Sequence, residues 1–319
     1  MRAFEYLEPA TLAEASALLH RCGGRASVLA GGTDLLVQIK ASHRQPARVI
    51  NIKKIPGMDV LTFDAAEGLR IGALVTTREV ETSDMARRHY ASLAKAVTDF
   101  ASIQVRNRAT VVGNVCRASP SADTLAPLIA DRAQVHLYGL SGSRSMPVEA
   151  FVTGAGKTAL AADELVSRLT VPAPRPYTGK AYLKHGRRVQ MELATVGVAV
   201  SITVERGQCL DVGIVLAAVG PTPIRAVHAE AMLRDRPISA GLVLQAAHAA
   251  MEDARPISDV RASAATAARW WACSRAVPSN WPCRKRRPTD APIHRTHPQR
   301  RAPRTRGGAA QHAARRAAP

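Results

Sequence analysis

Cysteine clusters are missing from this sequence. Its 319 residues hold only five cysteines, and these are Cys22, Cys116, Cys209, Cys273 and Cys283. No two of them are spaced as CxxC or grouped with histidines, which excludes a disulfide framework and gives no ligand set for zinc or an iron–sulfur cluster. The ten histidines show no metal-ligand spacing either. We therefore expect no metal centre within this chain.

Long apolar runs are also missing. No run approaches the roughly 20 residues that a membrane-spanning helix needs. The N-terminal stretch MRAFEYLEPATL carries acids where a signal peptide would need an apolar segment. The sequence predicts a chain without a membrane span, located in the cytoplasm.

Several familiar nucleotide and catalytic signatures are absent as well. No GxGxxG follows the first predicted strand, so the Rossmann dinucleotide fold is not supported. The segment Gly154–Thr158 resembles the end of a P-loop, but the required glycine is replaced by Phe151. Ser119, Ser121 and His136 form no recognisable nucleophile arrangement. We expect no catalytic acid, base or nucleophile.

The net charge of +19 is concentrated in one segment. From Arg261 to Pro319 there are fourteen lysines and arginines and one acid, Asp290, so this segment carries +13 of the total. All three tryptophans lie there too, and the hydrophobic periodicity stops. Such a basic tail could bind nucleic acid, but nothing in residues 1–260 resembles a nucleic-acid module. We expect residues 262–319 to be disordered or frameshifted, and no nucleic-acid partner.

Two regions of different texture precede this tail. Thr11 and Glu14 have capping-box spacing before a helix that Gly23-Gly24 ends. The apolar pattern adds strands at Ser27–Leu29, Ala47–Ile52 and Leu69–Ala73 and helices at Thr76–Glu81 and Ala91–Phe100. After the proline-rich linker 172–176, closely connected strands predict an antiparallel sheet, and they are Gly179–His185, Ala194–Val204 and Gln208–Val219. Helices are then predicted at Ile224–Arg234 and Ser239–Ala254.

The first candidate site is the glycine turn that follows strand Ser27–Leu29. The turn is Ala30-Gly31-Gly32-Thr33-Asp34, and an apolar run at helical spacing begins at Leu35. Glycine allows positive φ and a close approach of the backbone, and a helix start favours an anion. Thr33 or Asp34 would be the natural N-cap.

A second glycine turn lies about eighty residues later in the printed sequence. Thr110-Val111-Val112-Gly113-Asn114 combines a hydroxyl, a glycine and an amide, which suit a diphosphate. Asp123 follows a Ser-Pro-Ser turn and could accept hydrogen bonds from a sugar or from ring hydroxyls. The two turns together predict a clamp for a dinucleotide. The basic run Lys184, His185, Arg187 and Arg188 is either a solvated strand edge or a cofactor contact.

These motifs resemble a known family. The residues that carry the resemblance are 30–35 (AGGTDL), 101–107 (ASIQVRN), 110–114 (TVVGN), 119–123 (SPSAD) and 255–261 (RPISDVR). The chain resembles the FAD-binding medium subunit of molybdenum hydroxylases of the carbon monoxide dehydrogenase and xanthine dehydrogenase type. The resemblance covers about residues 1–265.

The resemblance implies an α+β chain with two folded domains. A vanillyl-alcohol-oxidase/PCMH-like FAD-binding domain of two α/β subdomains would occupy residues 1–172. A small domain with an antiparallel sheet and helices would occupy residues 177–261. Val112 is a departure, because many relatives carry a second glycine there. The tail is another, since relatives continue with a patterned helix.

The resemblance also implies which residues contact FAD. Loop Ala30–Leu35 and segment Thr110–Asn114 would hold the pyrophosphate, and Leu29 would also bind the cofactor. Phe100 would lie near the cofactor, Asp123 would contact it and Val166 would line it. Lys184 would approach the flavin from the second domain.

The implied function is electron transfer through FAD to an acceptor. Because the chain has no cysteine cluster, it would need a small [2Fe-2S] subunit and a large molybdenum-cofactor subunit, with a dimer of heterotrimers as the expected assembly. A free-standing flavin oxidase of the same fold is the alternative enzyme. Its substrate pocket would need convergent polar or aromatic groups, and aromatic residues make up only 4% of the chain.

Removing residues 262–319 tests the interpretation of the tail. If the tail is not native sequence, the shortened chain should bind FAD as tightly as the full chain, measured by flavin fluorescence. Translation of the neighbouring reading frame should also reveal helix-patterned sequence, and its absence there would contradict the frameshift.

Overall fold

The computed structural model describes residues 2–186, 188 and 191–254. The predicted tail 262–319 and the segment 255–261 that contributes to the family resemblance lie outside these described residues. Within the described part, no helix is long and apolar enough to cross a membrane.

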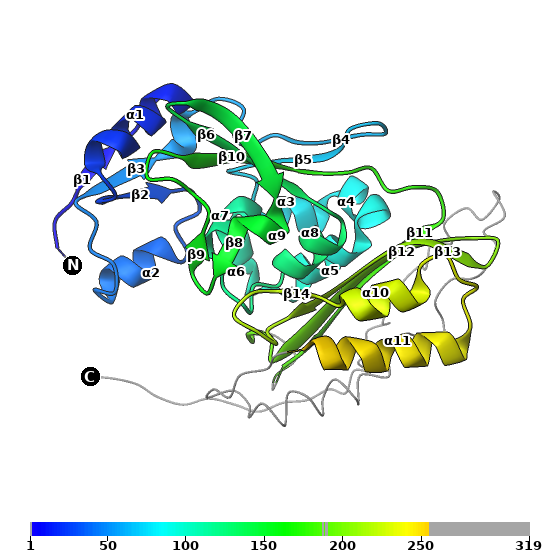
Figure 1. The fold of residues 1–319 in the computed structure, drawn as a ribbon. Helices are drawn as coiled ribbons and strands as arrows, with labels where there is room; N and C mark the ends of the chain where they lie inside the picture. Colours follow the sequence, from blue (N-terminus) through cyan, green and yellow to red (C-terminus); the bar gives the residue numbers. More distant parts are fainter. Residues whose placement is uncertain (1, 187, 189–190, 255–319) are drawn as a thin grey trace, which may run out of the picture. The chain divides into compact units, whose positions relative to one another are not determined.

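A three-stranded parallel sheet begins the chain (Figure 1). Its strand order is β1 (Glu5–Leu7), β3 (Arg48–Asn51) and β2 (Ala26–Leu29). The hydroxyl of Thr11 caps α1 (Leu12–Cys22) by accepting from the Glu14 N–H, and Gly23 ends it with a φ of 52°. Both predicted ends of this helix are confirmed. The Glu14 carboxylate accepts from the N–H of Ala10 rather than from Thr11. Helix α2 (Leu35–Lys40) and the 3-10 turn η1 (Ile52–Lys54) follow strands β2 and β3.

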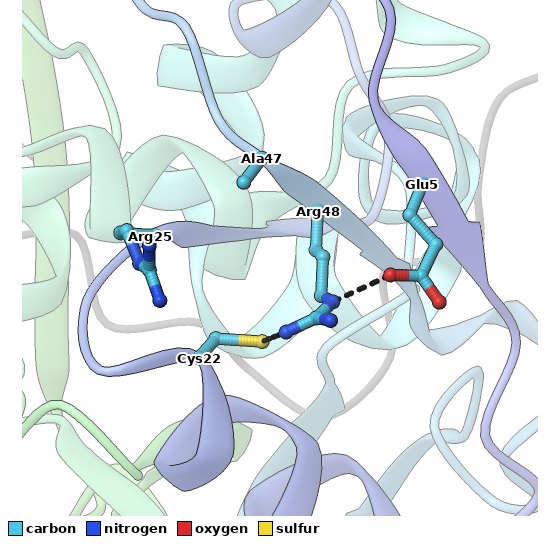
Figure 2. A pocket seen from close by; sticks show the side chains of 5 residues that line it. All are labelled: Glu5, Cys22, Arg25, Ala47 and Arg48. Atoms are coloured by element: carbon cyan, nitrogen blue, oxygen red, sulfur yellow. Dashed lines mark hydrogen bonds and ion pairs between the residues drawn. The ribbon is translucent and has the colours of Figure 1, made fainter.

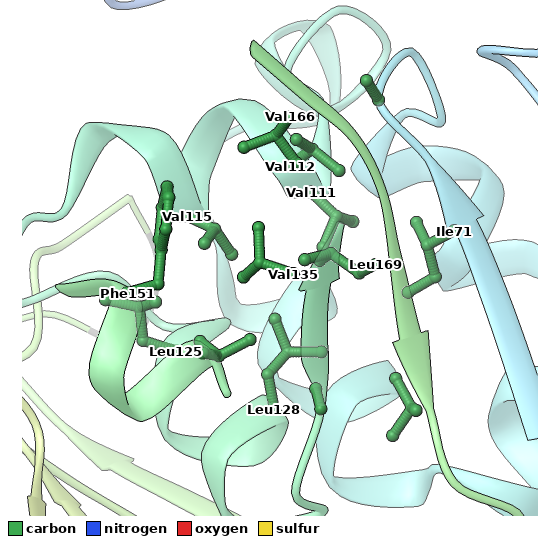
Figure 3. Close-up of a cluster of buried hydrophobic side chains, with 14 of the residues drawn as sticks. Ile71, Val111, Val112, Val115, Leu125, Leu128, Val135, Phe151, Val166 and Leu169 are labelled. Atoms are coloured by element: carbon green, nitrogen blue, oxygen red, sulfur yellow. The ribbon is translucent and has the colours of Figure 1, made fainter. Parts of the chain in front are cut away.

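An antiparallel five-stranded sheet follows the parallel sheet along the chain. Its order is β4 (Leu61–Asp64), β5 (Gly68–Gly72), β10 (Leu165–Val171), β6 (Gln134–Gly139) and β7 (Gly142–Pro147). One face is apolar: Ile71, Leu169 and Val135 are fully buried there and pack beside residues of α7 and α8 (Figure 3). Of these five strands, the sequence predicted only β5. Its neighbour β10 comes from about a hundred positions later in the sequence, so no local pattern indicates this pairing.

Seven short helices lie between these strands. They are α3 (Thr77–Thr82), α4 (Asp84–His89), α5 (Ala91–Asp99), α6 (Ile103–Arg106), α7 (Val111–Arg117), α8 (Leu125–Ala130) and α9 (Val148–Phe151). A small hairpin of β8 (Val152–Gly154) and β9 (Lys157–Thr158) follows α9. Thr76 and Glu79 form a complete capping box at α3, so the predicted helix starts one residue after Thr76.

The second predicted region is a four-stranded antiparallel sheet. Its strands are β11 (Thr178–His185), β12 (Val196–Glu205), β13 (Gln208–Ala217) and β14 (Ile224–Arg225). Helices α10 (Val227–Leu233) and α11 (Ala240–Asp253) pack on each other and against one face of this sheet (Figure 1). The predicted helix Ile224–Arg234 is therefore wrong at its start, because Ile224 and Arg225 pair with β13.

The other face of this sheet packs on α5 and α8, and its Tyr182, Ala199 and Val215 belong to the main hydrophobic core. A buried ion pair joins the same elements. Lys180 of β11 lies 2.7 Å from Asp131, the residue that ends α8, with side chains 5% and 2% exposed. The Lys180 ammonium also lies 4.3 Å from the ring centroid of Tyr90. Burying a charge away from water is unfavourable unless an opposite charge is paired with it.

Replacing Lys180 by Met should therefore lower the free energy of unfolding by about 3–5 kcal/mol, because it leaves the Asp131 carboxyl buried without its cation. The double variant Lys180→Met/Asp131→Leu should recover much of this loss. Urea denaturation measures both. A loss below about 1 kcal/mol, typical of a surface pair, would contradict this account.

Candidate functional site

The two predicted glycine segments meet at a cavity of about 240 Å³. It is lined by Ala30, Gly31, Lys53, Leu74, Thr76, Asn107, Arg108 and Thr110. Three of these were predicted as site residues from the two separate turns. The structure therefore brings the two turns to one place.

Gly31 determines how closely the two segments approach. A Cβ built on Gly31 would lie 2.1 Å from the Arg108 carbonyl oxygen and 3.1 Å from the Cα of Ala109. Only a residue without a side chain allows this backbone contact. Gly32 has the other use of glycine, since its φ is +79° where the chain turns toward α2. Gly31 is thus required by the close backbone contact, and Gly32 by its positive φ.

The second glycine segment is the first turn of a helix rather than a loop. Thr110 is the N-cap of α7, and its hydroxyl accepts from the Gly113 N–H at 3.0 Å. A Cβ on Gly113 would lie 2.7 Å from that hydroxyl. The side chains of Val111 and Val112 are buried in the core, so at these two positions only backbone atoms can face a ligand.

Asp34 does not have the predicted capping role. It occupies the N-cap position of α2, but its side chain makes no capping hydrogen bond. Its carboxylate lies 3.5 Å from the guanidinium of Arg117, at the end of α7. The ion pair links the first glycine turn to the helix that the second one begins. Thr33, beside it, is half-buried.

Other predicted residues lie at different depths. Leu29 and Leu35 pack with Ile39 and Val49 in a small apolar cluster behind the first turn. Val166 of β10 is 5% exposed in the main core, near Val112 (Figure 3). The amide oxygen of Asn114 accepts from the Thr124 hydroxyl at 2.6 Å.

The structure brings the predicted residues Asp123 and Lys184 together, and they form an ion pair with each other. The Asp123 Oδ2 lies 2.9 Å from the Lys184 ammonium, and Oδ1 accepts from the Tyr182 hydroxyl at 2.7 Å. Burial raises the pKa of Asp123, while the nearby Lys184 opposes that rise. Burial and Asp123 also raise the pKa of Tyr182. Lys184 is thus no solvated strand edge, since its side chain is 9% exposed.

Phe100 lies in a tightly held turn that follows α5. The Arg106 guanidinium donates to the carbonyl oxygens of Phe100 at 2.8 Å and of Ala101 at 2.9 Å, and it pairs with Glu81. On the other side, Lys184 donates to the Asp99 carbonyl at 3.2 Å. Ala101 has a φ of 45°, which is rare for a non-glycine residue. The turn with Phe100 is therefore fixed from two directions.

The sequence prediction missed the two cations of the cavity, Lys53 and Arg108. Lys53 follows β3, and Gly31 follows β2, its parallel neighbour in the sheet. Residues just after parallel strands lie at the same sheet edge, so this pairing could have indicated Lys53. Arg108 immediately follows the quoted motif 101–107.

A second cavity, of about 250 Å³, lies elsewhere and is lined by Glu5, Cys22, Arg25, Ala47 and Arg48 (Figure 2). Arg48 bridges it by donating to Glu5 at 2.6 Å and to the Cys22 sulfur at 3.6 Å. None of the predicted site residues lines this cavity, so it is separate from the candidate site.

Comparisons with known proteins agree on one family. The family model described as the FAD binding domain in molybdopterin dehydrogenase matches residues 2–174, and the model of the CO dehydrogenase flavoprotein C-terminal domain matches residues 180–265. The chain is 33% identical over 261 residues to the carbon monoxide dehydrogenase medium chain of Hydrogenophaga pseudoflava, covering 82% of this chain and 90% of that one.

A second relative and a solved structure show a similar degree of sequence identity. The xanthine dehydrogenase FAD-binding subunit of Escherichia coli is 31% identical over 259 residues, or 81% of this chain and 88% of that one. A solved structure of the Hydrogenophaga pseudoflava carbon monoxide dehydrogenase, which lacks the Mo-pyranopterin moiety of its cofactor, superposes with a TM-score of 0.81 and 33% identity. It covers 85% of this chain and 93% of that one.

Replacing Gly31 by Ala should separate the two segments at the cavity. Because the new Cβ would meet the Arg108 carbonyl, we expect the free energy of unfolding to fall by about 1–3 kcal/mol, as for other overpacked sites. Gly241→Ala in α11 is the matched control, since nothing lies within 4 Å of its Cβ position. Urea denaturation of both variants measures this, and equal stability would refute the close contact.

Proposed function

Because the chain belongs to the family of FAD-binding domains of molybdopterin dehydrogenases, we propose that it is the FAD-binding electron-transfer subunit of a molybdenum-dependent hydroxylase or dehydrogenase. The cavity between the two glycine segments is the observation that supports this most directly. When bound, FAD supplies redox chemistry, taking up electrons from iron–sulfur clusters and giving them to an acceptor.

The cavity suits a diphosphate in both size and charge. Its volume of about 240 Å³ lies below the roughly 300–1,000 Å³ of pockets that enclose a whole ligand. A part of the cofactor is therefore the better match. Lys53 and Arg108 bring two positive charges, while Thr76 and Asn107 bring polar groups. Phosphate oxygens are bound best by such charged donors.

The proposed cofactor contacts follow from this placement. The pyrophosphate would be held by Ala30–Asp34 and by the start of α7 at Thr110–Asn114. Val111 and Val112 would contact it through their backbone atoms and not through their side chains. Asp123 and Lys184, already paired at 2.9 Å, would lie farther along the cofactor, together with Phe100. Leu29, Leu35 and Val166 would support these contacts from the hydrophobic clusters in which they lie.

The proposed partners come from the relatives. Those are named as the medium chain and the FAD-binding subunit of larger dehydrogenases. We extend this to the present chain as a small [2Fe-2S] subunit and a large molybdenum-cofactor subunit, assembled as a dimer of heterotrimers. Among the described residues no group of three or more His, Cys, Asp and Glu side chains could hold a metal ion.

Reconstitution with FAD tests the proposal. The purified chain should gain the absorbance of a bound flavin, and from its native host it should co-purify with one small cysteine-rich and one large subunit. A chain that takes up no flavin would refute the function. A lone chain that oxidises a substrate would favour a free-standing oxidase.

Replacing Lys53 or Arg108 by Gln should weaken FAD binding by about 10- to 100-fold, since a hydrogen bond to a charged group contributes about 1.5–3 kcal/mol. Lys54→Gln is the matched control, because Lys54 pairs with Glu8 at 2.8 Å and does not line the cavity. Titration of FAD by fluorescence gives the Kd values. An equal loss in the control variant would contradict the proposed phosphate site.

A further inference from the structure

The outer face of the five-stranded sheet carries a cluster of cations. Arg70 of β5 lies directly opposite Thr170 of β10, and Arg168 of β10 lies directly opposite His136 of β6. Residues alternate between the two faces of a strand, and the neighbours Leu69, Ile71 and Leu169 point into the core. Arg70, Arg168 and His136 therefore share the opposite face, and we name these three residues the cationic face.

Within residues 2–186, 188 and 191–254, no carboxylate lies within 4.0 Å of the Arg70 or Arg168 guanidinium. Asp64, on the neighbouring strand β4, accepts instead from the N–H groups of Ala66 and Glu67 in its own turn. By contrast, the sheet arginine Arg144 has a carboxylate partner. The cationic face thus lacks a counter-charge from the described chain.

The neighbouring charges influence one another. Burial and then the charge of Arg70 lower the pKa of Arg168. Burial, Arg168 and Arg70 together lower the pKa of His136, whose Nε2 lies 2.9 Å from the Thr170 hydroxyl. Like charges held together are unfavourable, and an anion placed over them would remove that cost.

The part of the chain outside the described residues is poor in acids that could pair with these arginines. Residues 255–319, outside the described part, contain two acids, Asp259 and Asp290, against fifteen lysines and arginines, and the whole chain has a net charge of +19. A second copy would bring further positive charge. A different molecule is therefore the better source of the counter-charge.

We propose that the cationic face binds an acidic segment of a partner protein that presents at least two Asp or Glu carboxylates. Each arginine presents a planar fork of N–H donors that matches a carboxylate in two parallel hydrogen bonds. Two such forks on adjacent strands set a spacing for two carboxylates, which a peptide segment can meet. His136, beside them, can add a third contact when it is protonated. The proposal does not depend on FAD.

The test uses the isotope-labelled full chain and a blocked tetraglutamate peptide, followed by NMR of the His136 ring and of the Arg70 and Arg168 amides. These signals should move saturably with peptide and return at high salt. In Arg70→Gln/Arg168→Gln the His136 movement should fall at least fivefold. The control variant Lys40→Gln/Arg44→Gln removes two exposed charges elsewhere and should leave it unchanged.

A local readout matters because the basic tail can bind any polyanion. His136 signals that do not move, or that move equally in both double variants, would overturn the proposal. Inorganic phosphate or a short oligothymidylate of equal charge moving them as strongly would also overturn it, because the face would then not select a protein segment. Arg70 is exposed, so the single variant Arg70→Gln repeats the test with little risk to folding.

Discussion

The backbone contact between Gly31 and Arg108 is the constraint on which the candidate site depends. A Cβ at position 31 would lie 2.1 Å from the Arg108 carbonyl oxygen. The first glycine turn can therefore approach the segment before α7 only because residue 31 is glycine. This contact places the carboxyl ends of β2 and β3 beside the N-terminus of α7 and leaves between them the cavity lined by Lys53 and Arg108. The ion pair of Asp34 with Arg117 joins the same two segments a second time.

Helix α8 is joined to strand β11 by acids near both of its ends. Asp123 precedes the helix and pairs with Lys184, while Asp131 ends it and pairs with Lys180. The two lysines are four residues apart on one strand, so they share a face. Buried ion pairs contribute little net stability but strongly disfavour any arrangement that separates them. They therefore fix how the second sheet lies on the helices that carry the proposed cofactor contacts.

Several motif residues have structural tasks in this fold. Thr110 caps α7, Val111 and Val112 fill the core, and the Asn114 amide oxygen is bound by Thr124. Conservative changes at such positions act through the shape of the backbone, which is what a diphosphate contacts. Valine at 112, where many relatives have glycine, is compatible with this fold, because its side chain is buried in the core and does not line the cavity.

The sequence by itself determined the local features: the Thr11 cap, the Gly23 stop, the helix that begins near Thr76, the three long strands after residue 177 and the two glycine segments. Each depends on neighbours within a few residues, so its pattern is visible in the chain. Only the tertiary structure decided that β10 pairs with β5, that Ile224 joins a strand, that Lys53 meets Gly31 and that Lys184 faces Asp123. These contacts join segments that are distant in the sequence. Bringing such segments together costs loop-closure entropy, which is offset only by burial shared across the whole core. No local pattern therefore encodes which segments meet.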